Sequence, residues 1–161
     1  MKLHIRDIKH LFIKSSDLPD DLLFDSSNIN TDSRTFKGNE IFLALEGDKF
    51  DGNNFIVDIL KQKPLFFITN KEQVCTARHA VVESGKKFLI ELSKLVLKKL
   101  SITKVAITGS NGKTTTKDLI VHFLKNKFND DTVLFTKGNY NNEIGLPLSI
   151  LQSQGTEKFA V

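Results

Sequence analysis

The stretch from Val105 to Thr116, VAITGSNGKTTT, constrains this chain more than any other. It reads as a short buried strand, a loop bracketed by Gly109 and Gly112, and a helix that begins near a lysine and three threonines. Such a sequence makes a phosphate cradle, because glycines let backbone N–H groups turn inward and the dipole of the helix favours an anion. Lys113 can place its charge on terminal phosphates, and the hydroxyl of Thr114 is placed to hold Mg²⁺.

The loop departs from the strict nucleotide-binding pattern G-x-x-x-x-G-K-[ST]. That pattern requires a glycine at position 107, where this chain has Ile107. What remains is a shortened form, Gly109-x-x-Gly112-Lys113-Thr114. The alternative is a strand, a turn and a helix that merely contain glycine and lysine. We favour the nucleotide site because the three elements follow in the order that such a site requires.

Composition limits the class of protein and its partners. The 161 residues are 40% hydrophobic and 26% charged, enough for one domain or for a small domain plus part of another. A formal charge of +4 fits anionic small molecules, although a lysine-rich solvated surface explains the charge alone better, and it gives little support for nucleic acid. Cys75 is the only cysteine, so no intramolecular disulfide can form. No run approaches the ~18 apolar residues of a membrane helix and no signal peptide is evident, so we predict a cytoplasmic protein without a membrane partner.

Apolar segments alternate with helical patterns along the chain. Wholly apolar strands are expected at Ile41–Leu45 and Leu65–Ile68, with a helix over Asn54–Lys61 between them. Strands of this kind joined by helices are typical of a parallel sheet covered on both faces. Other helices are expected at 86–100, 112–128 and up to Leu151, and other strands at 105–107, 132–136 and 158–161.

The mostly polar residues 70–84 mark a candidate domain boundary. We therefore predict an α/β fold with a small N-terminal α/β domain over residues 1–82, followed over 83–161 by the start of a P-loop-type parallel α/β ATPase domain. In the helix 112–128, the apolar residues are expected to form the buried side. These residues are Leu119, Ile120, Phe123, Leu124 and Phe128.

Three stretches of the sequence resemble the Mur ligase family, and they occur in the right order. Thr108–Thr116 is similar to the ATP loop of that family. Thr31–Arg34 and Phe50–Gly52 resemble its N-terminal substrate domain. Thr136–Pro147 resembles the member that adds D-alanyl-D-alanine and separates it from the sister enzyme that adds the third stem residue. The resemblance covers about residues 28 to 151.

The resemblance implies a ligase that uses ATP and Mg²⁺ to make a peptidoglycan precursor. ATP would phosphorylate the terminal carboxylate of a UDP-linked tripeptide, and the amine of D-alanyl-D-alanine would then attack the acyl phosphate. Residues 1–82 would bind the UDP-linked precursor, and residues 83–161 would be the first part of the central ATP-binding domain. Lys113 would act in catalysis, and Thr114 would hold Mg²⁺. The implied phosphate contacts are Gly109, Ser110, Asn111, Gly112, Lys113, Thr114 and Thr115.

Candidate contacts for the UDP end lie where strands give way to turns. Ser33 and Arg34 can donate hydrogen bonds to a diphosphate or a uracil, whereas the alternative is that Asp32 and Ser33 cap the turn and Arg34 pairs locally. The resemblance leads us to favour uridine-nucleotide binding by these three residues. The segment of Phe50, Asp51 and Gly52 is a further candidate, although Asp51 could simply cap a helix.

Asn139, Asn141 and Asn142 form a third candidate substrate site. Their amides can donate to and accept from sugar hydroxyls and peptide groups. A turn stabilised by asparagine side chains is the alternative. Their place near the phosphate loop leads us to favour substrate contact. The four histidines show no metal-ligand spacing, so we expect no histidine-based metal site.

Other functions remain open from the sequence. One is a non-catalytic module that binds the UDP-linked precursor. The others are the sister ligase that adds the third residue, which Asn139–Pro147 disfavours, and a folate-type polyglutamate ligase, which Thr31–Gly52 disfavours. The family has three domains, and this chain would stop inside the second, so we expect an N-terminal fragment that does not ligate alone. Apolar faces on an incomplete sheet could drive self-association.

Overall fold

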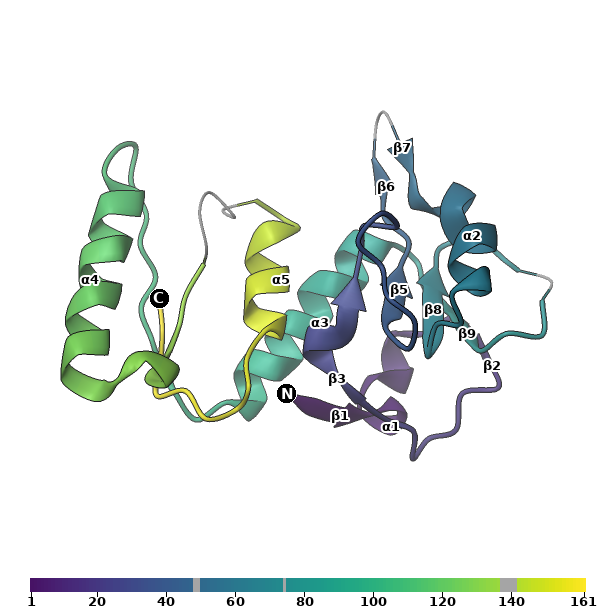
Figure 1. Ribbon diagram of the computed structural model, residues 1–161, viewed down its shortest axis with the longest axis horizontal. Helices are drawn as coiled ribbons and strands as arrows, with labels where there is room; N and C mark the ends of the chain where they lie inside the picture. The colour runs from purple at the N-terminus through teal and green to yellow at the C-terminus, as the bar shows by residue number, and fades with distance from the viewer. Residues whose placement is uncertain (48–49, 74, 137–141) are drawn as a thin grey trace. The chain divides into compact units, whose positions relative to one another are not determined.

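The computed structural model describes residues 1–47, 50–73, 75–136 and 142–161 (Figure 1). The chain divides into two compact units, Lys2–Leu92 and Ser93–Val161, and Met1 groups with the second. Helix α3 (Gly85–Lys99) contains the boundary between them. The prediction that a precursor-binding domain ends at residue 82 concerns function and stays a prediction.

A five-stranded sheet forms the centre of the amino-terminal unit. Its order is β2-β9-β8-β5-β4, with β2 antiparallel to β9 and all other neighbours parallel. The strands are β2 (Lys14–Ser16), β9 (His79–Val81), β8 (Phe66–Thr69), β5 (Ile41–Leu43) and β4 (Ile29–Asn30). The register places Phe42 beside Phe67, so the two most apolar strands are adjacent. The predicted parallel sheet is confirmed.

Both faces of the central strands β5 and β8 are buried. On one face, Phe42 and Phe67 pack against Ile56 and Ile59 of α2 (Ile56–Lys61). Because side chains alternate along a strand, Phe66 lies on the opposite face, where its ring meets the edge of Phe24 at 5.8 Å between centroids. Burial on both faces explains why these strands are apolar at every position.

The remaining elements of this unit are short. A two-stranded antiparallel sheet pairs β1 (Lys2–His4) with β3 (Leu23–Asp25), and a hairpin pairs β6 (Glu46–Gly47) with β7 (Phe50–Asp51). Single turns of helix complete the unit: α1 (Ile5–Ile8), η1 (Lys9–Leu11), η2 (Ser26–Asn28) and η3 (Gly52–Phe55). The Lys14–Ser16 strand is polar and largely exposed at the sheet edge, so it carries no apolar pattern.

A three-stranded parallel sheet, ordered β10-β12-β11, organises the carboxy-terminal unit. Its strands are β10 (Thr103–Lys104), β12 (Phe159–Ala160) and β11 (Val133–Leu134), with helices α4 (Lys113–Phe128), η4 (Asp130–Thr132) and α5 (Gly145–Leu151). The expected buried strand at 105–107 is wrong: the strand ends at Lys104, and Ala106 is exposed. The pairing of β10 with β12 is only two residues long, and after the hydrogen bond from Val105 to Ala160 the chain turns into the loop.

Helix α4 buries only part of the predicted side, in which Ile120, Leu124 and Phe128 are half-buried. Leu119 and Phe123 are 53% and 67% exposed, whereas Lys117 and Val121 are buried. The prediction for Leu119 and Phe123 is therefore wrong, because this narrow sheet covers only part of the helix surface. None of the helices in the described ranges is long and apolar enough to cross a bilayer.

Gly52 is a packing requirement of the amino-terminal unit. Its N–H donates to the carbonyl of Leu45 at 2.8 Å, and a Cβ built on it would lie 2.8 Å from the Leu45 nitrogen. We expect Gly52→Ala to reduce the free energy of unfolding by about 1–3 kcal/mol, as other overpacked sites do. At Gly47 the nearest atoms that a Cβ would meet belong to the ring of Phe50, which is exposed and can move, so Gly47→Ala should cost about 0.5 kcal/mol or less. Urea denaturation of both variants measures the difference, and equal losses would contradict this account.

Candidate phosphate loop and substrate edge

The loop between β10 and α4 has the backbone of a glycine-dependent turn. Gly109 has φ +149° and Gly112 has φ +79°, both in the region that L side chains rarely adopt. Gly112 is the residue that caps α4, and the N–H of Thr116 donates to its carbonyl at 2.9 Å. The helix begins one residue after the predicted start. The sequence prediction of a glycine-bracketed loop leading into a helix is therefore confirmed.

The loop is open to solvent and carries the predicted side chains. Ser110, Asn111, Thr114 and Thr115 are exposed, and Lys113 is half-buried. The ammonium group of Lys113 crosses the loop to the carbonyl of Gly109. The first N–H groups of an α-helix have no acceptor within the helix, so the start of α4 presents donors and the positive end of the helix dipole at this loop. This arrangement suits an anion.

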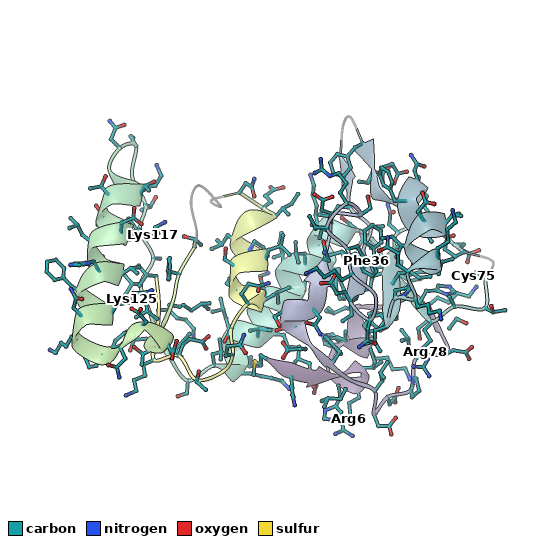
Figure 2. The ribbon with its side chains drawn as sticks, viewed as in Figure 1. Arg6, Phe36, Cys75, Arg78, Lys117 and Lys125 are labelled. Carbon is teal, nitrogen blue, oxygen red and sulfur yellow. The ribbon has the colours of Figure 1, made fainter. Side chains whose placement is uncertain are left out.

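A cavity of about 450 Å³ adjoins the loop within the carboxy-terminal unit. Lys113, Thr114 and Lys117 from α4 bring polar groups to it. Its other walls come from the end of α3, the strand ends and α5: Leu97, Lys104, Val105, Ala106, Ile107, Leu134, Phe135, Thr136, Leu146, Ser149, Ile150, Ala160 and Val161. In Figure 2, Lys117 and Lys125 leave α4 on the side of the strands, where Lys117 bonds Thr136 and Lys125 lies over the ring of Phe135. The cavity thus combines an apolar wall with a cationic one.

Asp32 and Arg34 form a local ion pair directly after β4. The guanidinium contacts the carboxylate through Nε at 2.9 Å and Nη2 at 2.6 Å, and the Arg34 N–H also donates to it at 3.0 Å. These hydrogen bonds from Arg34 hold the pKa of Asp32 at about 2. The Arg34 side chain remains 85% exposed, and Ser33 lies half-buried in the same turn. The local pairing that the sequence left open is present, while the predicted nucleotide contact stays a prediction.

Asp51 is the centre of a polar network at the end of β7. It caps η3 by accepting from the N–H of Asn53 at 2.9 Å, and it pairs with Lys71, whose hydrogen bond lowers the pKa of Asp51. Asn53 also donates to Asn70 at 2.9 Å and accepts from the hydroxyl of Thr69. The capping role that the sequence analysis allowed for Asp51 is therefore confirmed. Its role as a substrate contact, with the exposed Phe50 and the buried Gly52, stays a prediction.

Asn142 stabilises the turn that precedes helix α5. Its side-chain oxygen accepts from the N–H groups of Ile144 at 3.1 Å and Gly145 at 2.6 Å. This is the asparagine-stabilised turn that the sequence analysis named as the alternative. Asn139 and Asn141 lie outside the described residues.

Sequence reasoning missed several polar residues that the structure brings to these sites. Asn70 and Lys71 directly follow the buried strand β8, at the carboxyl edge of a parallel sheet, where ligand sites of open α/β folds usually lie. That position was the available signal. Lys117 lies four residues after Lys113 on α4, and this spacing puts two lysines on one face of the helix.

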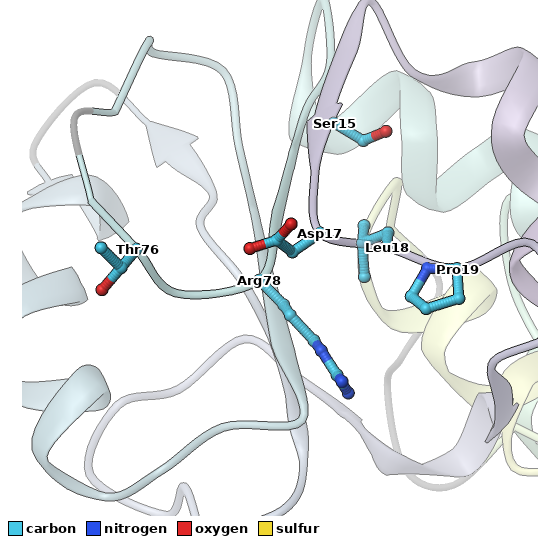
Figure 3. A pocket seen from close by; sticks show the side chains of 6 residues that line it. All are labelled: Ser15, Asp17, Leu18, Pro19, Thr76 and Arg78. Atoms are coloured by element: carbon cyan, nitrogen blue, oxygen red, sulfur yellow. The ribbon is translucent and has the colours of Figure 1, made fainter.

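A second hollow, of about 520 Å³, lies in the amino-terminal unit beside β2 (Figure 3). Its lining is Ser15, Asp17, Leu18, Pro19, Thr76 and Arg78, and all of these except Leu18 are exposed. Figure 3 shows the guanidinium of Arg78 extending away from the carboxylate of Asp17. Because Arg78 precedes β9, this hollow lies at the amino edge of the parallel strands, opposite the edge that usually binds ligands. The phosphate loop and the carboxyl edge remain the better candidates.

Comparisons with known proteins agree with these features. Residues 107–161 match the Mur ligase middle domain. The UDP-N-acetylmuramoyl-tripeptide–D-alanyl-D-alanine ligase of Haemophilus influenzae is 38% identical over 135 residues, which cover 83% of this chain and 30% of that protein. The enzyme of the same name from Bacillus subtilis is 34% identical over 136 residues, 83% of this chain and 29% of that protein.

Solved structures agree with the sequence comparisons. The crystal structure of MurF from Acinetobacter baumannii superposes with a TM-score of 0.85 at 25% identity, over 100% of this chain and 35% of that one. The MurF ligase of Thermotoga maritima in complex with ADP gives a TM-score of 0.76 at 36% identity, over 86% of this chain and 32% of that one. The chain thus spans about a third of the length of these relatives, and its predicted resemblance to the Mur ligase family is confirmed.

The Asp32–Arg34 pair leads to a prediction about how the Asp32 carboxyl group titrates. Because the pKa of Asp32 in the folded chain is about 2, below the ordinary 3.8, its carboxylate stabilises the fold above pH 3.8 and loses that effect as the pH falls through about 2. Between pH 5 and pH 3 the Asp32 carboxyl should therefore stay ionised. In Arg34→Met it should begin to titrate over the same interval. Carbon-detected NMR of the aspartate carboxyl groups measures this, and an unchanged titration in the variant would contradict the pairing.

Proposed function

We propose that this chain, a relative of the Mur ligases throughout its described fold, carries the phosphate-binding part of an ATP-dependent ligase. The observation that supports this most directly is the loop of Gly109 and Gly112 in positive-φ conformations, which leads into α4 at Lys113. The reaction would join D-alanyl-D-alanine to UDP-N-acetylmuramoyl-tripeptide, as the names of the relatives state for those proteins.

The loop suits the triphosphate of ATP. The backbone N–H groups of residues 109–115 would bind phosphate oxygens, and the Lys113 ammonium would leave the carbonyl of Gly109 to neutralise the β- and γ-phosphates. The exposed Thr114 hydroxyl on the cavity wall is a hard oxygen donor, which suits Mg²⁺, an ion that keeps most of its water ligands. When bound, Mg²⁺ neutralises phosphate charge. This chain would thus contribute positioning and charge neutralisation to the transfer of the γ-phosphoryl group.

The carboxyl edge of the amino-terminal sheet would bind the UDP end of the precursor. Arg34 uses Nε and Nη2 for Asp32, so its Nη1 donors remain for a diphosphate, and Ser33 lies beside it. In this proposal residues 1–82 form the precursor domain, with Phe50 and Asp51 at its edge, and residues 83–161 begin the ATP-binding domain. Asn139, Asn141 and Asn142 would contact the substrates.

The chemistry would proceed through an acyl phosphate. The terminal carboxylate of the tripeptide attacks the γ-phosphorus of ATP, a C–O–P link forms, and ADP leaves. The amine of D-alanyl-D-alanine then attacks the acyl carbon, and phosphate leaves as the amide forms. A reaction that consumes ATP and a UDP-linked precursor belongs in the cytoplasm, where we place this protein. The predicted self-association of the chain stays a prediction.

A non-catalytic precursor-binding module is the competing function. Isothermal titration with the UDP-linked tripeptide and with ATP separates the two, since a module of that kind would bind the first and not the second. We also expect the 161-residue chain with both substrates to release no more ADP than its Lys113→Ala variant. Turnover above that variant would show that the chain ligates alone.

Lys113 provides the direct test of the ATP site. Lys113→Met keeps the length of the side chain and removes its charge, so we expect the dissociation constant for ATP to rise at least about tenfold, since hydrogen bonds from charged groups contribute about 1.5–3 kcal/mol. Lys127→Met is the matched control, because Lys127 is an exposed lysine on the same helix. Isothermal titration measures both, and equal affinities would exclude Lys113 from phosphate binding.

A further inference from the structure

Lys117 is a buried cation on the helix that begins at the phosphate loop. It is 8% exposed, although lysine is almost never fully buried unless its charge is paired. It lies one turn beyond Lys113 and three residues beyond Thr114, so the three side chains share one face of α4. All three line the same cavity. Neither the loop motif nor the proposed phosphate contacts assign it a role.

The ammonium group of Lys117 is fixed to a strand end. Its Nζ donates to the carbonyl of Thr136 at 2.7 Å, and it lies 3.3 Å from the carboxylate of Asp118. Thr136 follows β11 at the carboxyl edge of the sheet. Asp118 is largely exposed, whereas the contact with Thr136 is partly buried and joins Lys117 to the strand end.

This contact completes a path of hydrogen bonds across the sheet. The Val105 N–H, after β10, donates to Ala160 at 2.8 Å. The N–H of Val161 donates to Leu134 at 2.9 Å, and that of Thr136 donates to Val161 at 3.3 Å. From Thr136 the path reaches α4 through Lys117. The phosphate loop joins β10 to α4 covalently. The hydrogen bond of Lys117 to Thr136 therefore closes a continuous path of covalent and hydrogen bonds that includes the loop.

We propose that Lys117 is a positioning residue that holds the first turn of α4, and with it the hydroxyl of Thr114, at a fixed distance from the strand ends. This inference rests on the proposed function, because it gives Thr114 the role of a Mg²⁺ ligand. Because the loop is held at β10 on one side and at α4 on the other, it is already ordered before Mg²⁺ and phosphates bind. Such preorganisation strengthens binding. Without Lys117, α4 would be tied to β10 only through the loop itself and its remaining packing.

The effect of Mg²⁺ on ADP binding shows whether Lys117 positions the Mg²⁺ ligand or only stabilises the fold. We define the Mg²⁺ gain as the dissociation constant for ADP in EDTA divided by that in MgCl₂. Lys117→Met should reduce this gain about tenfold, the lower end of the effect of removing a group that orients a metal ligand. Lys117→Arg keeps a charged donor and should restore most of the gain, and Lys127→Met should match the unaltered chain. A residue that only supports the fold would lower the melting temperature and leave the gain unchanged.

The titrations use the full 161-residue chain with ADP as the probe. An unaltered Mg²⁺ gain in Lys117→Met overturns the inference while ADP binding by the unaltered chain still supports the proposed function. Failure of the unaltered chain to bind ADP would overturn the proposed function and this inference with it. If Lys117→Met does not fold, amide exchange of the unaltered chain decides: Mg·ADP should slow exchange at Thr136 and Val161 together with the first turn of α4. Unchanged exchange at those two strand-end amides would overturn the inference.

Discussion

Parallel strand pairing is the constraint on which both candidate sites depend. Parallel neighbours must be joined by crossovers, so the segments that follow each strand meet at one edge of the sheet. In the amino-terminal unit this edge gathers Asp32 and Arg34 after β4, and Asn70 and Lys71 after β8. In the carboxy-terminal unit the same rule brings the phosphate loop after β10 to the sheet edge at which Thr136 follows β11. Polar residues therefore lie together at the strand ends, while the residues within the strands form the core.

The elements that could be predicted from the sequence are those that their own local residues determine. The glycine-bracketed loop, the start of α4 and the apolar strands β5 and β8 all follow from local residues. The buried side of α4 does not, because it depends on how much sheet lies against the helix, and here Leu119 and Phe123 remain exposed. Strands β1, β2 and β3 were missed for a related reason: each is three residues long and is defined by a partner far along the chain.

Contacts of the candidate site residues could likewise be predicted where they are local in sequence, and could not where they join distant segments. The role of Asp51 as a cap and the pairing of Arg34 with Asp32 could be foreseen as alternatives, because each involves a neighbour two residues away. The contacts of Lys71 with Asp51 and of Lys117 with Thr136 join segments about twenty residues apart, so no local pattern reveals them. Local capping and ligand binding are compatible, since a turn that is already ordered presents its remaining donors at lower entropic cost.

The backbone of the phosphate loop has a consequence for how such sequences diverge. Gly109 and Gly112 have φ angles that L side chains rarely adopt, whereas Ser110 and Asn111 are exposed to solvent. A site that binds an anion through main-chain N–H groups can exchange those two side chains while keeping its chemistry. The backbone torsion angles therefore matter more for anion binding by this loop than the identities of those two side chains, and the recognisable sequence signal is the two glycines and the lysine that follows them.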